Sequence, residues 1–359
     1  MSKIQPITDM PDMGESCISH KVLHEIILAE KYDPFSKIAV TDNLSMLEYM
    51  PDDIEIVLFC NLPEGHTWGN IWVDQHVSNT KKQLYLKKYN CVVIQGCEQP
   101  LNNYHGFCAV GIDFGDFETF KVLDRSPLLY SKLSTYNLNP RHDFLVLAGK
   151  KEEREQFITQ LNARFNLSNS LIFHNLNLDI DTPDYKLYEE YGDFEFSSYQ
   201  WFDHEGMCLL NRDILPHKKM FDDCSVNIVI ETNQKIQTPY PYLSEKTYKP
   251  IIHETPFTIF GEPNSLEYLR KKGFATFDSI IDESYDNILD YNERLSAVIE
   301  SSIELLEKKK TKTSEIEEIC KHNKQHFLNK ERQQKILLDF KHKIDNLTFT
   351  SVSNLYNQI

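Results

Sequence analysis

The sequence predicts an α/β protein with two domains, each built on a parallel, doubly wound sheet. Short β-rich apolar runs alternate with stretches long enough to form helices, and connections of that length join parallel strands. The chain has 359 residues, more than a single hydrophobic core usually serves. We therefore expect two α/β/α domains that face each other across a cleft, with a helical C-terminal tail.

The first predicted domain covers residues 1–137. Its strands are expected at 54–60, 91–95 and 108–112, where apolar and β-branched residues form runs of strand length. The segment 78–88, between the first two of these strands, has the length and composition of a helix. A strand–helix–strand order of this kind favours a parallel sheet.

A polar, proline-containing stretch at 136–140 marks the boundary with the second domain. Directly after it, residues 143–165 have the pattern of a strand, a glycine turn and a helix, which is how a new α/β domain begins. We assign 138–345 to this domain and 346–359 to the tail. The later elements expected here are strands at 170–173, 226–230 and 256–260, helices from 244 and over 265–272, a loop-rich insert at 175–219, and an almost wholly helical region at 292–344.

The chain carries 54 acidic and 38 basic residues, a formal net charge of −16. Proteins that wrap nucleic acid need cations to neutralise its backbone, so this balance argues against extensive wrapping. A local basic cleft stays open as a hypothesis, with lysine pairs at 81–82 and 87–88 and a lysine-rich run at 308–312 as candidates. The solvated face of a surface helix is the plainer interpretation of each.

The apolar runs of the chain are short. None approaches the ~20 residues that a membrane helix needs, and the N-terminus lacks the apolar core of a signal peptide. We therefore expect no membrane span and a cytoplasmic location, which for a viral protein means the host cytoplasm. Eight scattered cysteines without a CxxC pair indicate reduced core thiols.

Two groups of residues have the chemistry of metal ligands. Cys17, His20 and His24 have a spacing that also fits one helix face, and no second ligand cluster follows them. Asp179 and Asp181 form an Asp-x-Asp pair in a polar stretch, where a solvated turn is the plainer interpretation. We expect neither a metal ion nor another cofactor.

The densest group of polar residues lies around an expected strand end and the helix that follows it. Glu231 comes directly after the strand 226–230, and open α/β sheets bind ligands at the carboxyl ends of their strands. The next helix begins with Ser244, Glu245 and Lys246, so its free N–H groups and the positive end of its dipole lie at the same edge. A lysine there suits a diphosphate, and a carboxylate suits sugar or ribose hydroxyls. An ordinary N-cap serine with a first-turn glutamate is the alternative.

A second cationic turn follows the first strand of the second domain. Gly149, Lys150 and Arg154 combine a glycine turn with cationic side chains at a helix start, an arrangement that suits a diphosphate. Such turns occur in many α/β proteins. The hypothesis therefore depends on whether these residues lie opposite Glu245 and Lys246.

The run 226–261 resembles the donor-binding motif of α-1,3-fucosyltransferases. That motif is an apolar strand ending in Glu-Asn-Ser, a loop, Tyr-(Val/Ile)-Thr-Glu-Lys-Leu-Trp, and an apolar strand ending in Gly. This chain has I-V-I-E-T-N, Y-L-S-E-K-T-Y and P-F-T-I-F-G at those places. The resemblance implies that Glu231, Tyr242, Glu245 and Lys246 bind the nucleotide and the sugar.

Two departures from that motif bear on the identity of the sugar more than on the fold. The chain has Thr232 where the family has Asn, and Thr247 and Tyr248 where it has Leu-Trp. Farther on, the segments L-E-Y-L-R-K-K-G-F-A-T-F-D and I-D-E-S-Y-D resemble glycosyltransferases inferred in large phages and other viruses.

A weaker match to the fucosyltransferases lies in the first domain. The segment 95–100, Q-G-C-E-Q-P, is similar to the family's Glu-Ser-Pro, and the run 107–114 is similar to the strand that follows it. The resemblance implies that Glu98 is the general base of an inverting reaction. A carboxylate at a strand end facing the cleft would be placed to deprotonate an acceptor hydroxyl. A turn carboxylate before a proline is the other interpretation.

The resemblance implies a GT-B-like fold, with a Rossmann-like acceptor domain followed by a Rossmann-like donor domain. The expected activity is inverting, metal-independent transfer of a sugar from a nucleotide diphosphate to a glycan or another hydroxyl compound. Lys246 and either Lys150 or Arg154 would neutralise the diphosphate. A viral enzyme acting on a hydroxymethylated DNA base is one alternative, and it would need a basic cleft that accepts a flipped nucleotide. A non-catalytic protein that binds nucleotide sugars is the alternative of another class.

Overall fold

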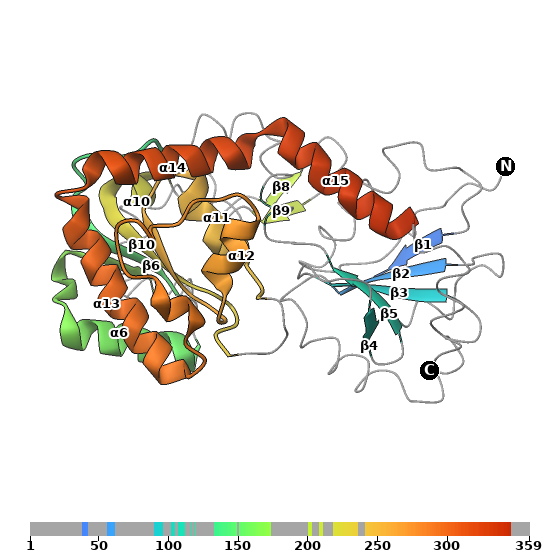
Figure 1. Ribbon diagram of the computed structural model, residues 1–359, viewed down its shortest axis with the longest axis horizontal. Coiled ribbons are helices and arrows are strands. Elements are labelled where there is room, and N and C mark those ends of the chain that lie inside the picture. Colours follow the sequence, from blue (N-terminus) through green and yellow to red (C-terminus); the bar gives the residue numbers. More distant parts are fainter. Residues whose placement is uncertain are drawn as a thin grey trace. The chain divides into compact units, whose positions relative to one another are not determined.

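The computed structural model describes residues 38–41, 56–61, 90–95, 102–104, 107–111, 116, 119, 133–148, 151–173, 200–202, 208–210, 218–235 and 241–345. The chain divides into two compact units: the N-terminal unit, Met1–Glu118 with Gln333–Ile359, and the central unit, Thr119–Arg332. Figure 1 labels their helices and strands.

The N-terminal unit contains a five-stranded sheet with the order β1-β2-β3-β5-β4. The strands β1, β2, β3 and β5 run parallel, and β4 pairs antiparallel with β5 at one edge. The expected strands at 54–60, 91–95 and 108–112 are confirmed as β2, β3 and β5, while the expected helix at 78–88 lies outside the described residues. The bounds are β1 (Ile38–Thr41), β2 (Ile56–Asn61), β3 (Asn90–Gln95), β4 (Asn102–Tyr104) and β5 (Phe107–Gly111).

The sheet of the central unit has four parallel strands in the order β11-β10-β6-β7. From β6 the chain forms β7 on one side, and later forms β10 and then β11 on the other. The direction of winding therefore reverses between β6 and β10, which are neighbours in the sheet. The bounds are β6 (His142–Leu147), β7 (Leu171–Phe173), β10 (Cys224–Ile230) and β11 (Phe257–Phe260).

Helices cover both faces of this sheet, which confirms the α/β class (Figure 1). On one face α13 packs against β10, β11 and α6, and on the other α11 packs against β10 and α14. The expected helical region at 292–344 is confirmed as α13, α14 and α15. The bounds are α6 (Glu152–Arg164), α10 (Lys218–Asp223), α11 (Glu245–Ile252), α12 (Ser265–Lys271), α13 (Tyr291–Lys309), α14 (Thr313–Leu328) and α15 (Lys330–Asp345), with 3-10 turns at Leu167–Asn169 and Ser284–Asn287.

Strand β11 shows why these apolar runs are fully buried strands. Side chains alternate between the two faces of a strand, and both faces of β11 are covered. Phe257 packs against Phe277, whereas the hydroxyl of Thr258 lies 2.7 Å from that of Ser302 on α13. Phe260 returns to the α13 face and contacts Phe157 of α6, with ring centroids 5.2 Å apart. A strand buried on both faces reads as a continuous apolar run rather than an alternating one.

The C-terminal end of α11 is tied to residues 133–137. The backbone N–H of Ser134 donates to Nδ1 of His253 at 3.0 Å. Glu254, which adopts a left-handed conformation with φ of 51°, accepts from the backbone N–H of Tyr136 at 3.0 Å and pairs with Lys324 at 3.0 Å. These contacts hold the helix that bears the candidate site at the end opposite to that site.

The rest of the described chain includes one short hairpin. Strands β8 (Gln200–Phe202) and β9 (Cys208–Leu210) pair antiparallel within the segment expected as a loop-rich insert. In the part of the chain that the structure describes, none of the helices combines the length and the hydropathy that a membrane span requires.

Candidate functional site

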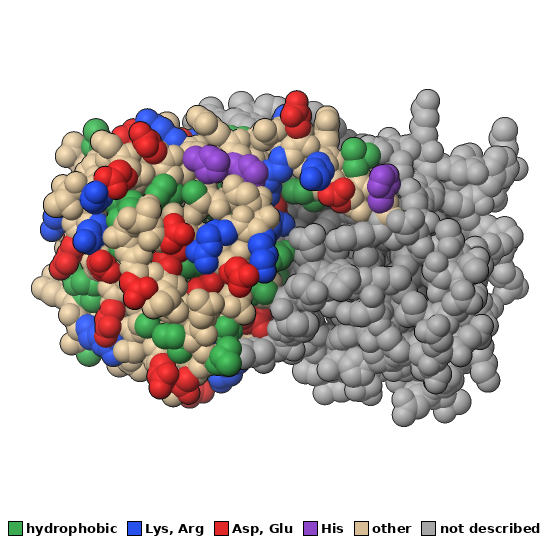
Figure 2. All heavy atoms as spheres, viewed as in Figure 1, with side chains coloured by type: hydrophobic (Ala, Val, Ile, Leu, Met, Phe, Trp, Pro, Cys, Tyr) green, Lys and Arg blue, Asp and Glu red, His purple; other side chains and the backbone are tan. Residues whose placement is uncertain are grey.

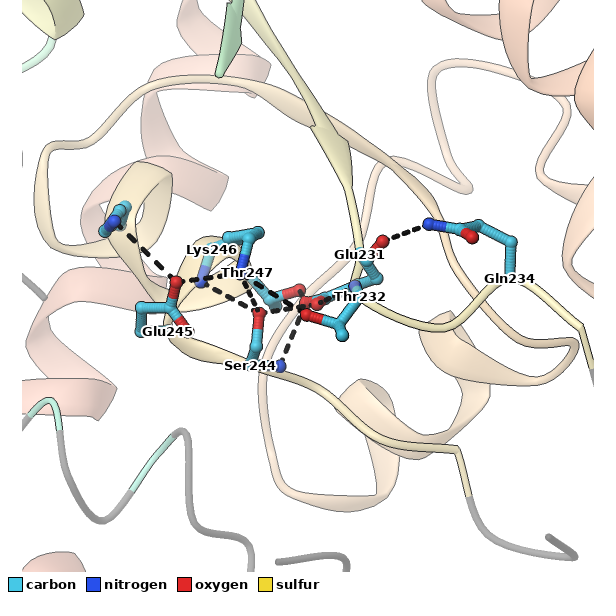
Figure 3. Close-up of polar contacts among 8 residues, drawn as sticks. Glu231, Thr232, Gln234, Ser244, Glu245, Lys246 and Thr247 are labelled. Carbon is cyan, nitrogen blue, oxygen red and sulfur yellow. Dashed lines mark hydrogen bonds and ion pairs between the residues drawn. The ribbon is translucent and has the colours of Figure 1, made fainter. Parts of the chain in front are cut away.

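The candidate site lies where β10 ends and α11 begins (Figure 3). Glu231 follows the last residue of β10, and Ser244 is the N-cap of α11. The Ser244 backbone is extended, with φ of −89° and ψ of −179°, and its hydroxyl accepts from the N–H of Lys246 at 3.3 Å. The expected helix start is therefore confirmed, and its cap is the ordinary serine cap.

Glu231 has both carboxylate oxygens occupied by donors from the chain itself. Oε1 accepts from the N–H of Ser244 at 3.0 Å and from the hydroxyl of Thr247 at 2.6 Å. Oε2 accepts from the hydroxyl of Ser244 at 2.5 Å and from the N–H of Thr232 at 3.2 Å. The residue is 0% exposed, and a carboxylate has about four acceptor positions. Its charge therefore anchors the positive end of α11 rather than facing solvent.

The end of β11 lies close against Glu231. The N–H of Glu231 donates to the carbonyl of Phe260 at 3.0 Å. A Cβ on Gly261 would lie 3.5 Å from Cβ of Glu231, an ordinary van der Waals contact, and 2.9 Å from Oγ of Ser265, so a larger residue there would have to displace the Ser265 hydroxyl. The side-chain amide of Gln234 also donates to the carbonyl of Glu231. The segments that follow β10 and β11 are thus packed together at the carboxyl edge of the sheet.

Lys246 and Glu245 form the part of the site that solvent reaches. Their side chains are 23% and 18% exposed, and Nζ of Lys246 lies 2.9 Å from Oε1 of Glu245. The same Nζ donates at 3.4 Å to the hydroxyls of Thr232 and Ser244. Burial alone would raise the pKa of Glu245, but the charges of Lys246 and Lys249 outweigh it and hold that pKa at about 2. Glu245 is therefore ionised at neutral pH.

Arg154, near the start of α6, acts electrostatically on Lys246. Burial lowers the pKa of Lys246 and the positive charge of Arg154 lowers it further, but Glu245 and Glu231 outweigh both, so the net pKa is raised. Arg154 is buried near the start of α6, which follows β6. Two cations from helices that follow adjacent parallel strands therefore lie within electrostatic range of each other.

Tyr242 is held by its backbone rather than presented to solvent. The residue is 5% exposed, and its N–H donates at 3.1 Å to Oε2 of Glu262, which lies just beyond β11. Its place in the described structure is that of a packed residue at the entry to α11.

The residues expected at the site fall into three groups. Glu231, Glu245 and Lys246 lie together, and Arg154 lies within electrostatic range of them. Tyr242 belongs to the same region because it lies two residues before Ser244 and its N–H donates to Glu262. The remaining expected residues, Glu98, Gly149 and Lys150, lie outside the described residues.

Sequence reasoning missed the roles of Thr247, Glu262 and Arg294. Thr247 is the third residue after the N-cap Ser244, a position where side chains often bond back to the helix start, so a signal was present. Glu262 and Arg294 carry no local signal, because their partners are distant in sequence.

The described residues contain no group of three or more His, Cys, Asp or Glu side chains placed to hold a metal ion. The pairs considered in the sequence, Cys17 with its histidines and the Asp179–Asp181 pair, lie outside the described residues. No known protein family and no curated protein matches this chain.

Proposed function

We propose that the chain is a nucleotide-sugar glycosyltransferase whose central unit binds the diphosphate of the donor at the start of α11. The observation that carries the proposal is the pair of cations Lys246 and Arg154, supplied by the helices that follow β10 and β6. The direction of winding reverses between these two strands, and open α/β sheets bind nucleotides at such a point.

Lys246 is the group that would exchange partners when a diphosphate binds. It is partly exposed, and two of the three hydrogen bonds of its ammonium are 3.4 Å long and go to neutral hydroxyls. Phosphate oxygens would replace these hydroxyls and form shorter, charge-assisted bonds. The 2.9 Å contact with Glu245 can persist beside them.

The two glutamates take different roles in this proposal. Glu245 is ionised and partly exposed, so it can accept hydrogen bonds from sugar or ribose hydroxyls. Glu231, which the sequence suggested as a second ligand contact, is a positioning residue, because its carboxylate already accepts four bonds. It fixes the first turn of α11 and thereby the place of Lys246.

The reaction would be an in-line displacement at the anomeric carbon of the sugar. The acceptor oxygen bonds to that carbon, the bond from the carbon to the diphosphate oxygen breaks, and the acceptor proton passes to a general base. Lys246 and Arg154 would stabilise the negative charge that develops on the leaving diphosphate. Glu98 stays the candidate base on the fucosyltransferase resemblance.

A glycan or another small hydroxyl compound is the acceptor we favour. On the face that Figure 2 shows, basic and acidic side chains of the described residues are interspersed. A DNA acceptor would call for a concentrated basic surface, and the net charge of −16 points away from one.

A thermal-shift panel of GDP-, UDP- and ADP-sugars on the full chain tests the proposal. A ligand that binds only the folded state raises the melting temperature, and we expect at least one of these donors to do so. Slow hydrolysis of that donor would then separate an enzyme from a non-catalytic binding protein. Unchanged melting with every donor would refute the proposal.

A further inference from the structure

Arg294 is a buried cation that the proposed reaction does not use. It lies in the first turn of α13 and is 2% exposed, one of the largest fully buried side chains of the described chain. Burying a charge without partners is costly, so its guanidinium must find acceptors. Its acceptors are four backbone carbonyls. Nε donates to the carbonyl of Gly261 at 3.2 Å, and one terminal nitrogen donates to that of Gln234. The other terminal nitrogen donates to the carbonyl of Leu289 at 3.3 Å and also to that of Ile288.

Two of these carbonyls belong to the segments that build the candidate site. Gln234 follows β10, and its side chain is bonded to the carbonyl of Glu231. Gly261 follows β11 directly after Phe260, whose carbonyl accepts from the N–H of Glu231. We name 231–235 and 261–264 the carboxyl-edge loops. A single guanidinium therefore holds both loops at once, from the side of the sheet that α13 covers.

We propose that Arg294 is the positioning residue that locks the two carboxyl-edge loops and so presents the start of α11 to the donor. The role in donor binding rests on the proposed function, whereas the locking of the loops does not. The Glu231 carboxylate accepts hydrogen bonds from the hydroxyls of Ser244 and Thr247. A shift of the loop that contains Glu231 would therefore move the first turn of α11. Lys246, two residues beyond the cap, would move with it.

The planar fork of arginine is what the role requires. Its donors diverge in fixed directions and reach carbonyls on separate segments, whereas lysine offers one compact ammonium on a flexible stem. Arg294→Lys therefore keeps the charge and most of the volume but cannot span both loops. Phe260, whose ring lies 5.9 Å from the guanidinium carbon, limits where a shorter cation could settle.

Hydrogen exchange of the full chain, followed by mass spectrometry, tests the locking directly. In Arg294→Lys we expect the amides of 231–235, 261, 262 and 264 to exchange about tenfold faster, selectively over those of β10 and β11. Ser302→Ala is the matched control, because Ser302 also lies on α13, and its hydroxyl bonds to Thr258 of β11 and to the Val298 carbonyl rather than to either loop. The proposal would be overturned if the two loops stay protected in Arg294→Lys. It would also be overturned if exchange in Arg294→Lys rises equally in the loops and in β10 and β11, or no more in the loops than it does in Ser302→Ala.

A milder variant covers the case in which Arg294→Lys does not fold. Gln234→Ala removes the side-chain bond to Glu231 and leaves the Arg294 bond to the Gln234 carbonyl in place. If Arg294 is the lock, the loop 231–235 stays protected to within about threefold of wild type. Exchange that rises tenfold or more in Gln234→Ala would show that the side chain, and not Arg294, holds the loop.

Nucleotide affinity separates the two proposals. Any of GDP, UDP or ADP that binds wild type should bind Arg294→Lys about tenfold more weakly, with Ser302→Ala close to wild type. Failure of all three to bind wild type would count against the proposed function, while the exchange result would still decide the role of Arg294. Equal affinity in wild type and Arg294→Lys would overturn the link between the locked loops and the donor.

Discussion

Replacing Thr247 with valine removes one hydrogen bond from the buried Glu231 carboxylate and little else. Both residues are 0% exposed, and the hydroxyl donates to Oε1 at 2.6 Å. Valine has nearly the same volume, so no cavity forms. Hydrogen bonds to charged groups contribute about 1.5–3 kcal/mol, and we expect Thr247→Val to lower the free energy of unfolding of the central unit by about 2 kcal/mol.

Hydrogen exchange of β10 measures that loss within the central unit alone. The chain has two units, so a melt of the whole chain need not be a two-state transition, whereas amides of a core strand report the opening of their own unit. For a domain of about 200 residues the loss corresponds to a fall of about 4–8 °C in its melting temperature.

Thr159→Val is the matched control for this prediction. Thr159 is exposed on α6, and its hydroxyl donates to the carbonyl of Glu155 in the same helix at 2.8 Å. We expect this control to change stability by no more than about 0.5 kcal/mol. Equal effects of the two substitutions would refute the view that Glu231 anchors α11 through Thr247.

Two further predictions concern Lys309 and Glu98. Burial lowers the pKa of Lys309 to about 8, although Cys320 and Cys224 act to raise it. At this side chain the unfolded state then binds more protons between pH 8 and the ordinary lysine value of about 10.5, so the contribution of Lys309 to the free energy of unfolding should rise across that window by about 3 kcal/mol. Urea unfolding of the central unit, compared between wild type and Lys309→Met across the window, checks this, because the difference between the two curves of free energy against pH isolates Lys309; parallel curves would contradict it. For Glu98, the proposed role as base predicts that Glu98→Gln lowers donor turnover by more than about a hundredfold, measured on the donor found by thermal shift, and near-normal turnover would refute that role.

The strands of the sheet could be predicted from the sequence because their signal is local. β10 and β11 are runs of apolar residues bounded by polar turns, and both are buried along their whole length. The start of α11 was equally readable, since Ser244 caps the helix through its own side chain. Local chemistry decided these elements, and the structure agrees with it.

The role of Glu231 could not be read from its neighbours in the chain. A carboxylate at a strand end looks like a ligand contact, but the donors that saturate it include Ser244 and Thr247, 13 and 16 positions later. The threonine at 247 is a departure from the resembled motif, and the structure gives it a partner. Sequence alone therefore suggested a ligand contact for Glu231, whereas its tertiary contacts give it the role of holding the start of α11.

Arg294 shows the same limit more strongly. In sequence it is one of many charges on a helix rich in Glu and Lys, a pattern typical of a solvated surface. Its acceptors at Gly261 and Gln234 lie 33 and 60 positions away. It is buried only because α13 packs against β10 and β11, which periodicity alone does not specify.

The affinity of the full chain for nucleoside diphosphates tests the central claim most directly. Titration calorimetry should be done with the nucleotide of whichever donor raises the melting temperature, on wild type, Lys246→Met and Lys271→Met. Lys271 is 69% exposed on α12 and pairs with Glu267, so its loss changes the net charge equally without touching the site. We predict binding to wild type and Lys271→Met, and affinity about tenfold or more weaker in Lys246→Met, the loss of one charge-assisted contact. Equal affinity of all three proteins would contradict the claim that Lys246 holds the diphosphate.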